Sequence, residues 1–252
     1  MGVTTTLDNG IGHLVLDLPP LNILTRAALA ELRAALARFA VEPKLRVLVL
    51  GAAGKHFSAG ADVGEHLPPH YLALIPEFLD TVEALDAFPV PVIAAVRGKC
   101  LGGGFELVQA VDMIVAGEGA AFGQPEIVLG VFPPAAAVLL PMRLPPGLAA
   151  RIIYSGDPVT AVECERGGLV TRLAPDEAVD EAAFELARRI ARHSGAALRL
   201  AKRALRGTGA DARKEALRQA GAVYLQDLME TRDAVEGLGA FVEKRQPAWS
   251  DA

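Results

Sequence analysis

One stretch of the sequence, residues 91–126, does most to constrain the fold. It opens with the nearly all-apolar run Pro91 to Val96, which predicts a buried strand. Gly98 and the triplet Gly102-Gly103-Gly104 then lead into a predicted short helix, and a second apolar strand is expected over residues 112–116. A glycine-rich turn between a strand and a helix leaves backbone N–H groups free and lets a ligand approach them closely. The stretch therefore predicts a strand–helix–strand unit with a candidate ligand site at its turn.

The same stretch carries two acidic residues, Glu106 inside the apolar helix and Glu126 in the segment FGQPE. Two interpretations compete. In the structural one, Glu106 favours the positive end of the helix dipole and Glu126 is solvated. In the chemical one, the glycine N–H groups bind a developing oxyanion and the two carboxylates transfer protons.

A second glycine-rich loop, GAAGKHFSAGADVG at residues 51–64, favours the chemical interpretation. It follows a predicted buried strand at 45–50, and Asp62 is placed to cap the helical segment behind it. An ordinary strand-to-helix loop is the alternative. Two such loops offer the paired N–H donors that hold an enolate oxygen. Two carboxyl groups around one water can activate that water and protonate the α-carbon of a conjugated thioester.

Covalent acyl-enzyme chemistry is less attractive, because no Ser or Cys stands with a His in a nucleophile motif. Metal-ligand spacings are absent as well, and we expect no metal and no separate cofactor.

Local signals predict the remaining elements. A hairpin is expected around Asn9-Gly10, and Thr25 is the expected N-cap of a helix ending near residue 40. Beyond Pro175 the pattern is almost wholly helical. Strand–helix alternation followed by a helical tail predicts an α/β core with an appended helical region rather than independent domains. The other predicted elements are helices at 76–87, 147–154, 160–166, 176–193, 195–206, 211–229 and 231–243, and a strand at 168–173.

Composition narrows the function classes. The chain of 252 residues is 52% hydrophobic and 22% charged, with a net charge of −5, which is globular and disfavours general nucleic-acid binding. No apolar run approaches the roughly 20 residues of a membrane span, and no signal peptide is apparent. Cys100 and Cys164 give no disulfide framework, so we expect a cytoplasmic protein.

A basic cluster at Arg199, Lys202, Arg203 and Arg206 has the spacing of one helix face. Such a cluster is most often solvated, and it can also attract a polyanion such as RNA.

Five segments in this order and spacing resemble the crotonase, or enoyl-CoA hydratase/isomerase, superfamily over nearly the whole chain. Each segment is weak alone and together they are specific. The resemblance implies a spiral of ββα units at residues 1–195 that holds an acyl-CoA site, and a dependent helical trimerisation region at 196–252. It also implies an acyl-CoA thioester substrate and a homotrimer or dimer of trimers, with no nucleic acid or membrane as partner. The segments are HFSAGADV at 56–63, GKCLGGGFEL at 98–107, DMIVA at 112–116, FGQPEIVLG at 122–130 and FVEKRQPAW at 241–249.

The resemblance also assigns site residues. It makes Glu106 and Glu126 the catalytic pair, with Glu106 activating water and Glu126 exchanging a proton with the α-carbon, and it makes the N–H groups of Ala61 and Gly103 an oxyanion hole. Gly64 stands where hydratases often have Lys, which removes one expected CoA contact. The substrate-binding candidates are Ala59, Asp62 and Phe132 at the acyl site, and Phe241 and Lys244 near the CoA phosphate and ribose, often of a neighbouring subunit.

A larger departure follows Glu126. The family pattern resembles GxxPGxGGTxxL, whereas residues 130–141 read GVFPPAAAVLLP. Proline and alanine make this segment stiffer and more apolar, which should raise the pKa of Glu126 and favour a compact cyclic acyl group. Together with PPLNILT at 19–25, it resembles the branch that hydrates cyclic dienoyl-CoA thioesters, the cyclohexa-1,5-diene-1-carbonyl-CoA hydratases.

The function implied is an enoyl-CoA hydratase-type lyase. One alternative is an enoyl-CoA double-bond isomerase, which needs a single glutamate. The other is a non-catalytic RNA- or acyl-CoA-binding member of the family.

Overall fold

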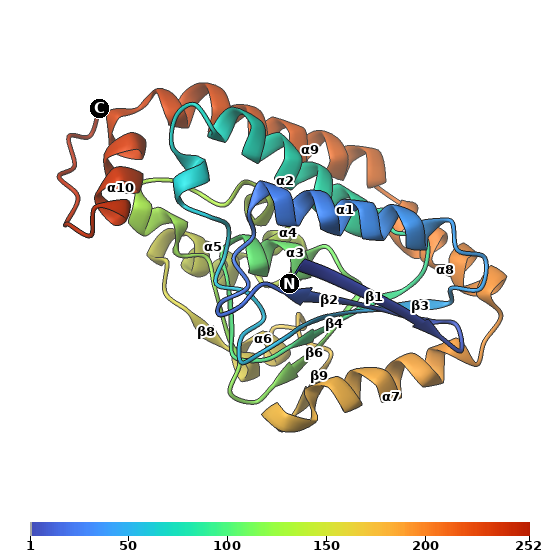
Figure 1. Cartoon of the computed structure of the whole chain (residues 1–252). Coiled ribbons are helices and arrows are strands. Elements are labelled where there is room, and N and C mark those ends of the chain that lie inside the picture. Colours follow the sequence, from blue (N-terminus) through green and yellow to red (C-terminus); the bar gives the residue numbers. More distant parts are fainter. Residues whose placement is uncertain (1) are drawn as a thin grey trace.

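A six-stranded sheet runs through the molecule in the order β1-β2-β3-β4-β6-β9, as the computed structural model of residues 2–252 shows (Figure 1). The first two strands form the predicted antiparallel hairpin, with positive φ at Asn9 and Gly10, and all other neighbours are parallel. The strands are β1 Gly2–Asp8, β2 Ile11–Asp17, β3 Val47–Ala52, β4 Val92–Val96, β6 Met113–Gly117 and β9 Arg172–Ala174.

A second, three-stranded sheet consists of β5 (Lys99–Leu101), β7 (Ala121–Gly123) and β8 (Val159–Thr160) in that order. Strands β4 and β6 lie in the large sheet, and the strand that follows each of them lies in the small one. Helix α3 (Gly103–Gln109) comes directly after β5. This repeated strand–strand–helix arrangement confirms the predicted fold class.

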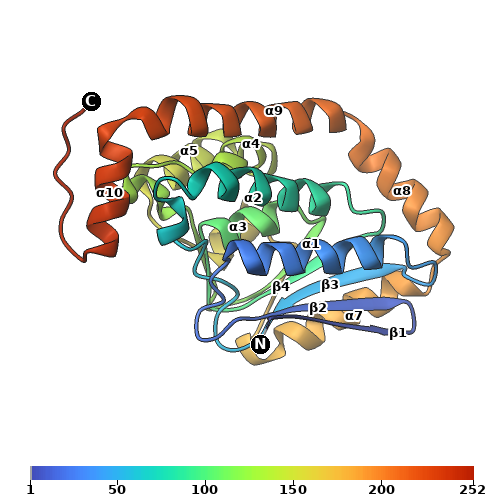
Figure 2. The ribbon, with the colours of Figure 1, turned by 45° about the horizontal axis from the view of Figure 1, so that its top comes forward.

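Helices cover both faces of the large sheet (Figures 1 and 2). Side chains alternate along β3, so Leu48 and Leu50 enter the main core while Val47 and Val49 face the opposite way. The main core includes buried residues of α1 (Arg26–Ala40) and α2 (Tyr71–Asp86), and the smaller core is closed by α7 (Val179–Ala191). The Thr25 side chain caps α1 as predicted, accepting from Ala28 N–H at 3.2 Å.

The C-terminal region is helical and packs on the rest of the chain. Helix α9 (Ala210–Ala222) lies along α2 and contacts α4 (Pro134–Arg143), as Figure 2 shows. A third apolar cluster joins Tyr224, Met229, Ala234 and Leu238 to Ile75 and Val131. The elements are α8 Gly195–Gly207, α9 Ala210–Ala222, a π-helical turn Val223–Asp227, a 3-10 turn Leu228–Glu230 and α10 Arg232–Val242.

The remaining helices connect the two sheets. Thr160 forms a capping box with Glu163 at the start of α6. The elements are α4 Pro134–Arg143, α5 Pro146–Ser155, α6 Ala161–Arg166 and the 3-10 turns Gly64–His66, Pro125–Leu129 and Asp176–Ala178. None of the helices within residues 2–252 combines the length and the apolarity that crossing a bilayer requires.

Several predicted segments differ from the structure. The strand predicted at 168–173 is β9 at Arg172–Ala174, and the helix predicted at 211–229 is α-helical only as far as Ala222. Helix α2 begins at Tyr71 instead of near residue 76, so Pro76 lies inside it. Pro76 is exposed, and solvent can hydrate the Leu72 carbonyl that loses its helical N–H partner. The proline-rich segment after Glu126, residues 130–141, is largely helical. Pro133 and Pro134 stand at the N-terminus of α4, where the N–H that proline lacks would have no helical partner.

The basic cluster on α8 is not a solvated face. Lys202 is 6% exposed and donates to Asp112 at 2.6 Å and to the Val90 carbonyl at 2.9 Å. Arg206 pairs with Asp86 at 3.0 Å. Arg199 donates to backbone carbonyls of the segment that enters β3. Three of the four side chains therefore bind protein acceptors, and the cluster no longer motivates RNA binding.

Candidate active site

The two glycine-rich loops lie against each other. Ser58 N–H donates to the Lys99 carbonyl at 3.1 Å, and Leu101 N–H donates to the Ser58 carbonyl at 3.0 Å. Gly104 must be glycine because a Cβ there would lie 2.5 Å from Ser58 Cβ. Gly102, at φ 51°, adopts a left-handed conformation that glycine tolerates best. These contacts bring the loops, far apart in the sequence, to one edge of the same cavity.

Ala61 and Gly103 both line this cavity, and each carries a backbone N–H group. Neither donates a hydrogen bond to any acceptor within residues 2–252. The two residues are neighbours, since a Cβ built on Gly103 would lie 3.4 Å from Ala61 Cβ. The structure therefore brings together two free backbone donors at the positions named from the sequence.

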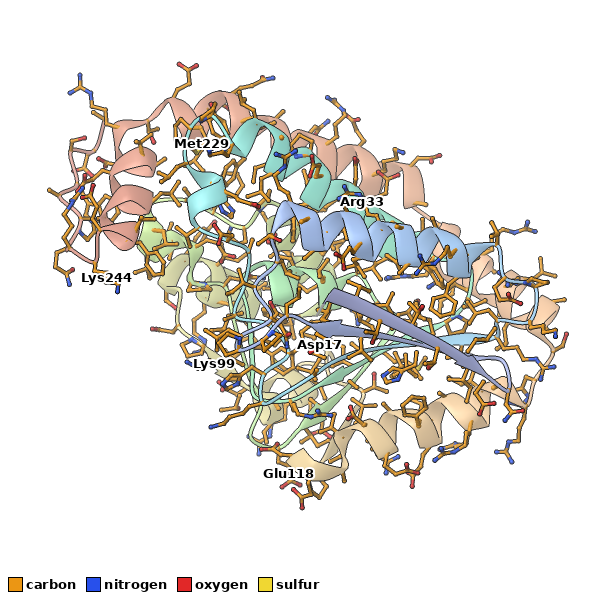
Figure 3. All side chains as sticks on the ribbon, viewed as in Figure 1. Asp17, Arg33, Lys99, Glu118, Met229 and Lys244 are labelled. Atoms are coloured by element: carbon orange, nitrogen blue, oxygen red, sulfur yellow. The ribbon has the colours of Figure 1, made fainter. Side chains whose placement is uncertain are left out.

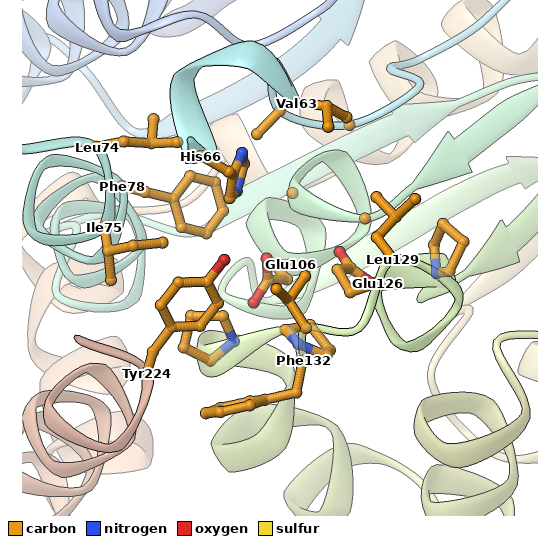
Figure 4. A pocket seen from close by; sticks show the side chains of 18 of the residues that line it. Val63, His66, Leu74, Ile75, Phe78, Glu106, Glu126, Leu129, Phe132 and Tyr224 are labelled. Atoms are coloured by element: carbon orange, nitrogen blue, oxygen red, sulfur yellow. The ribbon is translucent and has the colours of Figure 1, made fainter. Parts of the chain in front are cut away.

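The cavity has a volume of about 80 Å³ and a mostly apolar lining that includes Ile75, Phe78 and Leu238. Figure 4 shows the carboxyl groups of Glu106 and Glu126 directed into it. Ala59 and Phe132 also line it, and their contact with the acyl group stays a prediction.

Glu106 lies in the first turn of α3 and is 3% exposed. Its Oε1 accepts hydrogen bonds from Ala135 N–H at 2.7 Å and Ala136 N–H at 3.0 Å. Those groups are free donors of the first turn of α4, so Glu106 caps α4 from a neighbouring helix. The interaction fixes one carboxylate oxygen and favours the ionised form.

Glu126 lies in the 3-10 turn after β7, and its Oε1 would be 2.8 Å from a Cβ placed on Gly102. A side chain on Gly102 would displace the Glu126 carboxyl group from this position. The interpretation of Glu126 as a solvated residue is wrong, because the carboxyl group faces the cavity and burial dominates its pKa.

Two buried glutamines support Glu126, and the sequence analysis did not assign them a role. In the orientation that places the Gln124 amide nitrogen toward Glu126, this nitrogen donates to both carboxyl oxygens of Glu126 at 3.1 Å. The amide oxygen of Gln124 then accepts from Gln109 Nε2 at 2.9 Å, and this hydrogen-bond network decides the amide orientation. Both glutamines are almost fully buried. The available signal was a glutamine inside each of two otherwise apolar segments.

The two glutamates are electrostatically unequal. Burial raises the pKa of Glu106 to about 7, against the opposing effect of the Ala136 and Ala135 N–H donors. Burial and the neighbouring Glu106 raise the pKa of Glu126 well above its usual range. Because two carboxylates in one apolar cavity resist double ionisation, the pair holds a proton near neutral pH. That proton resides on Glu126, which leaves Glu106 as the base.

Asp62 supports the site from outside the cavity lining. Its carboxylate accepts from Glu65 N–H at 3.1 Å, which confirms the predicted cap. Its backbone carbonyl lies 2.8 Å from Nδ1 of His66, whose ring does line the cavity. The structure gives the Asp62 side chain this local contact and does not bring it to the acyl site.

Phe241 lies in the last turn of α10 and Lys244 just after this helix (Figure 3), and neither residue lines the cavity. Phe241 is 56% exposed and Lys244 is exposed. Their expected contact with CoA stays a prediction.

His66 and Tyr224 are cavity residues that the sequence analysis missed. Burial lowers the pKa of His66, so its imidazole is neutral at pH 7. Tyr224 reaches the cavity from the π-helical turn after α9. Neither residue stands in a recognisable motif, and only the tertiary contacts identify them.

Comparisons with known proteins agree with this geometry. Residues 6–252 match the family model of enoyl-CoA hydratase/isomerase. The chain is 41% identical to cyclohexa-1,5-dienecarbonyl-CoA hydratase of Thauera aromatica over 97% of this chain and 94% of that protein. It is 37% identical to 2,3-dehydroadipyl-CoA hydratase of Escherichia coli K12 over 90% and 89%.

Solved structures give the same result. The carnitinyl-CoA hydratase of Mycobacterium avium has a TM-score of 0.86 at 31% identity, covering 100% of this chain and 99% of that one. An enoyl-CoA hydratase/isomerase from Pseudoalteromonas atlantica T6c has a TM-score of 0.91 at 26% identity, covering 99% and 100%. Both the sequence and the fold therefore place this chain in the enoyl-CoA hydratase/isomerase family.

Proposed function

We propose that this protein adds water across a carbon–carbon double bond conjugated to a CoA thioester. One observation carries the proposal: two carboxyl groups of unequal pKa share an apolar cavity with the two free N–H groups of Ala61 and Gly103. An acid, a base and an oxyanion site are the parts that this reaction needs.

The roles follow from the surroundings of each group. The N–H groups of Ala61 and Gly103 donate to the thioester oxygen and stabilise the enolate that forms there. Glu106 accepts a proton from water while the water oxygen bonds to the substrate carbon. Glu126 gives its proton to the α-carbon of the substrate. The proton that Glu106 took from water then passes to Glu126, which restores the starting state. Gln124 holds the Glu126 carboxyl group in place throughout.

The glutamate pair supports hydration over double-bond isomerisation. Isomerisation moves one proton between two carbons, and a single carboxylate is enough for it. A second buried carboxyl group that caps a helix and faces the same cavity has no task in that reaction. We therefore retain hydration as the proposed activity.

We propose a compact cyclic enoyl or dienoyl group as the acyl part. The support is the name of the 41% identical relative and the enclosed apolar shape of the cavity. Phe132, Pro133 and Pro134 form one wall, with Tyr224 and Leu238 beside them. Discrimination by apolar fit is worth roughly 1–3 kcal/mol per methylene-sized difference. On that basis we expect the kcat/KM of a cyclic dienoyl-CoA to exceed that of crotonyl-CoA or a long-chain enoyl-CoA at least about tenfold.

The test is a panel of linear and cyclic enoyl-CoA thioesters, with product mass as the readout. Hydration adds one water, whereas isomerisation leaves the mass unchanged. Glu106→Gln and Glu126→Gln should each lower kcat about 10²- to 10⁴-fold, because each removes a proton-transfer group. Glu118→Gln, an exposed carboxylate at the opposite end of the molecule from the C-terminal helices (Figure 3), is the matched control. Near-full hydration by both active-site variants contradicts the proposal.

A further inference from the structure

The Tyr224 hydroxyl is a buried polar group without a role in the reaction steps proposed above. Four buried side-chain atoms within residues 2–252 have no hydrogen-bond partner, and this hydroxyl alone belongs to a residue that lines the cavity. Tyr224 is only 1% exposed. An unsatisfied buried hydroxyl is costly, and such groups in native proteins are rare enough to require a reason.

The surroundings of Tyr224 hold the hydroxyl in a defined place. Its ring packs against Phe132, with ring centroids 5.5 Å apart, and lies 6.5 Å from the His66 ring. It is carried by the π-helical turn Val223–Asp227, and such turns occur frequently at functional sites. Figure 4 shows the hydroxyl turned toward the Glu106 carboxylate.

The other donors around Glu106 are already used. The N–H groups of Ala135 and Ala136 bind the carboxylate itself. Pro134, the first residue of α4 and part of the same wall, has no N–H, although the family pattern has glycine at this position. The free N–H groups of Ala61 and Gly103 belong to the thioester oxygen in the proposed reaction. Among the side chains that line the cavity, Tyr224 carries the only hydroxyl, so it is the side-chain O–H donor available to an oxygen atom bound at Glu106.

The neighbouring His66 does not compete for this role. Its Nδ1 faces the Asp62 carbonyl, so the neutral ring carries its proton there and Nε2 is an acceptor. Burial and the two glutamates raise the pKa of Tyr224 above its usual range, so the phenol remains a protonated donor at working pH.

We propose that the Tyr224 hydroxyl donates a hydrogen bond to the water oxygen that Glu106 activates, and to the same oxygen when it is the hydroxyl group of the product. The inference rests on the proposed hydratase function. As the water proton moves to Glu106 and the carbon–oxygen bond forms, the oxygen carries partial negative charge, which a fixed donor stabilises. In the reverse direction the same donor stabilises the departing hydroxyl group.

The test begins with Tyr224→Phe, which removes the hydroxyl and keeps the ring. We expect kcat to fall about 5- to 10-fold, the size of one hydrogen bond, with KM changed by less than about threefold. The melting temperature should stay equal or rise, because the variant removes an unsatisfied buried group. Tyr71→Phe is the matched control, since Tyr71 packs in the same apolar cluster without lining the cavity.

A binding comparison separates this role from packing. The probes are the hydroxylated product thioester and the ring thioester that lacks its hydroxyl group. Tyr224→Phe should weaken binding of the first about 5- to 10-fold and leave the second unchanged. Equal losses for both ligands, or no loss for either, would overturn the inference while wild-type hydration remains. A wild-type protein that hydrates no thioester of the panel contradicts the proposed function instead.

Discussion

Glu106 and Glu126 carry the same functional group in different surroundings. Glu106 accepts hydrogen bonds from two N–H groups at the positive, N-terminal end of α4. The carboxyl group of Glu126 lies beside Gly102 and Gln124. Burial raises the pKa of both groups, but the two N–H donors oppose this effect at Glu106, whereas the charge of Glu106 adds to it at Glu126, so Glu106 ionises first. This difference allows one pair of glutamates to supply both a base and an acid.

The pair predicts an unusual pH dependence. Glu106 must be ionised, so kcat/KM should fall as pH drops through about 7, where a normal glutamate would still be ionised. Glu126 must be protonated, so kcat/KM should also fall at higher pH, as its raised pKa is passed. The two limbs belong to the coupled pair rather than to single residues.

A pH–rate profile for hydration from pH 5 to 10 measures this directly. A rate that stays constant between pH 5 and 9 would show that neither buried carboxyl group controls the reaction. In Glu106→Gln the charge that raises the pKa of Glu126 is gone, so the alkaline limb of its residual activity should move to lower pH.

At the scale of elements, a buried ion pair holds α8 against the sheet. Lys202 donates to Asp112, which also accepts from Val92 N–H at 2.8 Å at the start of β4. Removing one partner of a buried pair leaves an uncompensated charge and typically costs about 3–5 kcal/mol. Arg206 Nε lies 3.4 Å from Asp112 Oδ1 and compensates part of that charge, so Lys202→Met should lower the free energy of unfolding by at most about that amount, measured by urea denaturation.

The exposed neighbour Arg203 provides the comparison for this prediction. Arg203→Met should change the free energy of unfolding by no more than about 0.5 kcal/mol. The double variant Asp112→Asn/Lys202→Met removes both charges and should recover part of the loss. Equal stability of Lys202→Met and the wild type would mean that the pair contributes nothing to docking α8.

At the scale of the whole molecule, large apolar side chains remain exposed on the C-terminal region. Leu205 is 80% exposed, Phe241 56% and Val242 50%. Exposed apolar side chains mark interfaces where they are contiguous, and Phe241 and Val242 are adjacent at the end of α10. We expect a homotrimer or a dimer of trimers in which this region contacts neighbouring subunits.

Light scattering at micromolar concentration tests the assembly. A stable monomer would contradict it, and would also remove the expected contribution of Phe241 and Lys244 to a neighbour's CoA site.

If the assembly forms, Lys244→Ala should raise KM for the CoA thioester with little change in kcat, because a contact with the CoA phosphate binds substrate and transition state alike. Lys99→Ala, another exposed lysine (Figure 3), is a control for general charge effects.

Several features were predictable from the sequence because their signals are local. The Asn9-Gly10 turn, the Thr25 cap and the apolar strands depend on neighbouring residues, and the structure has all of them. The two glycine loops and Glu106 could also be named, because few other tasks require such residues in that order. Helix α4 was missed because Pro133, Pro134 and Pro141 look like helix breakers, although two of them stand at its permissive N-terminus.

The tertiary structure alone decided how the site functions. The sequence does not show that Glu106 caps α4, that Gln124 faces Glu126, or that Tyr224 completes the cavity from a C-terminal turn. Lys202 and Arg206 of α8 proved to be internal ion-pair partners for the same reason. Each of these features depends on groups that are far apart in the sequence and meet in the buried interior. Burial and hydrogen-bond partners there set the pKa values and leave the Tyr224 hydroxyl without a partner.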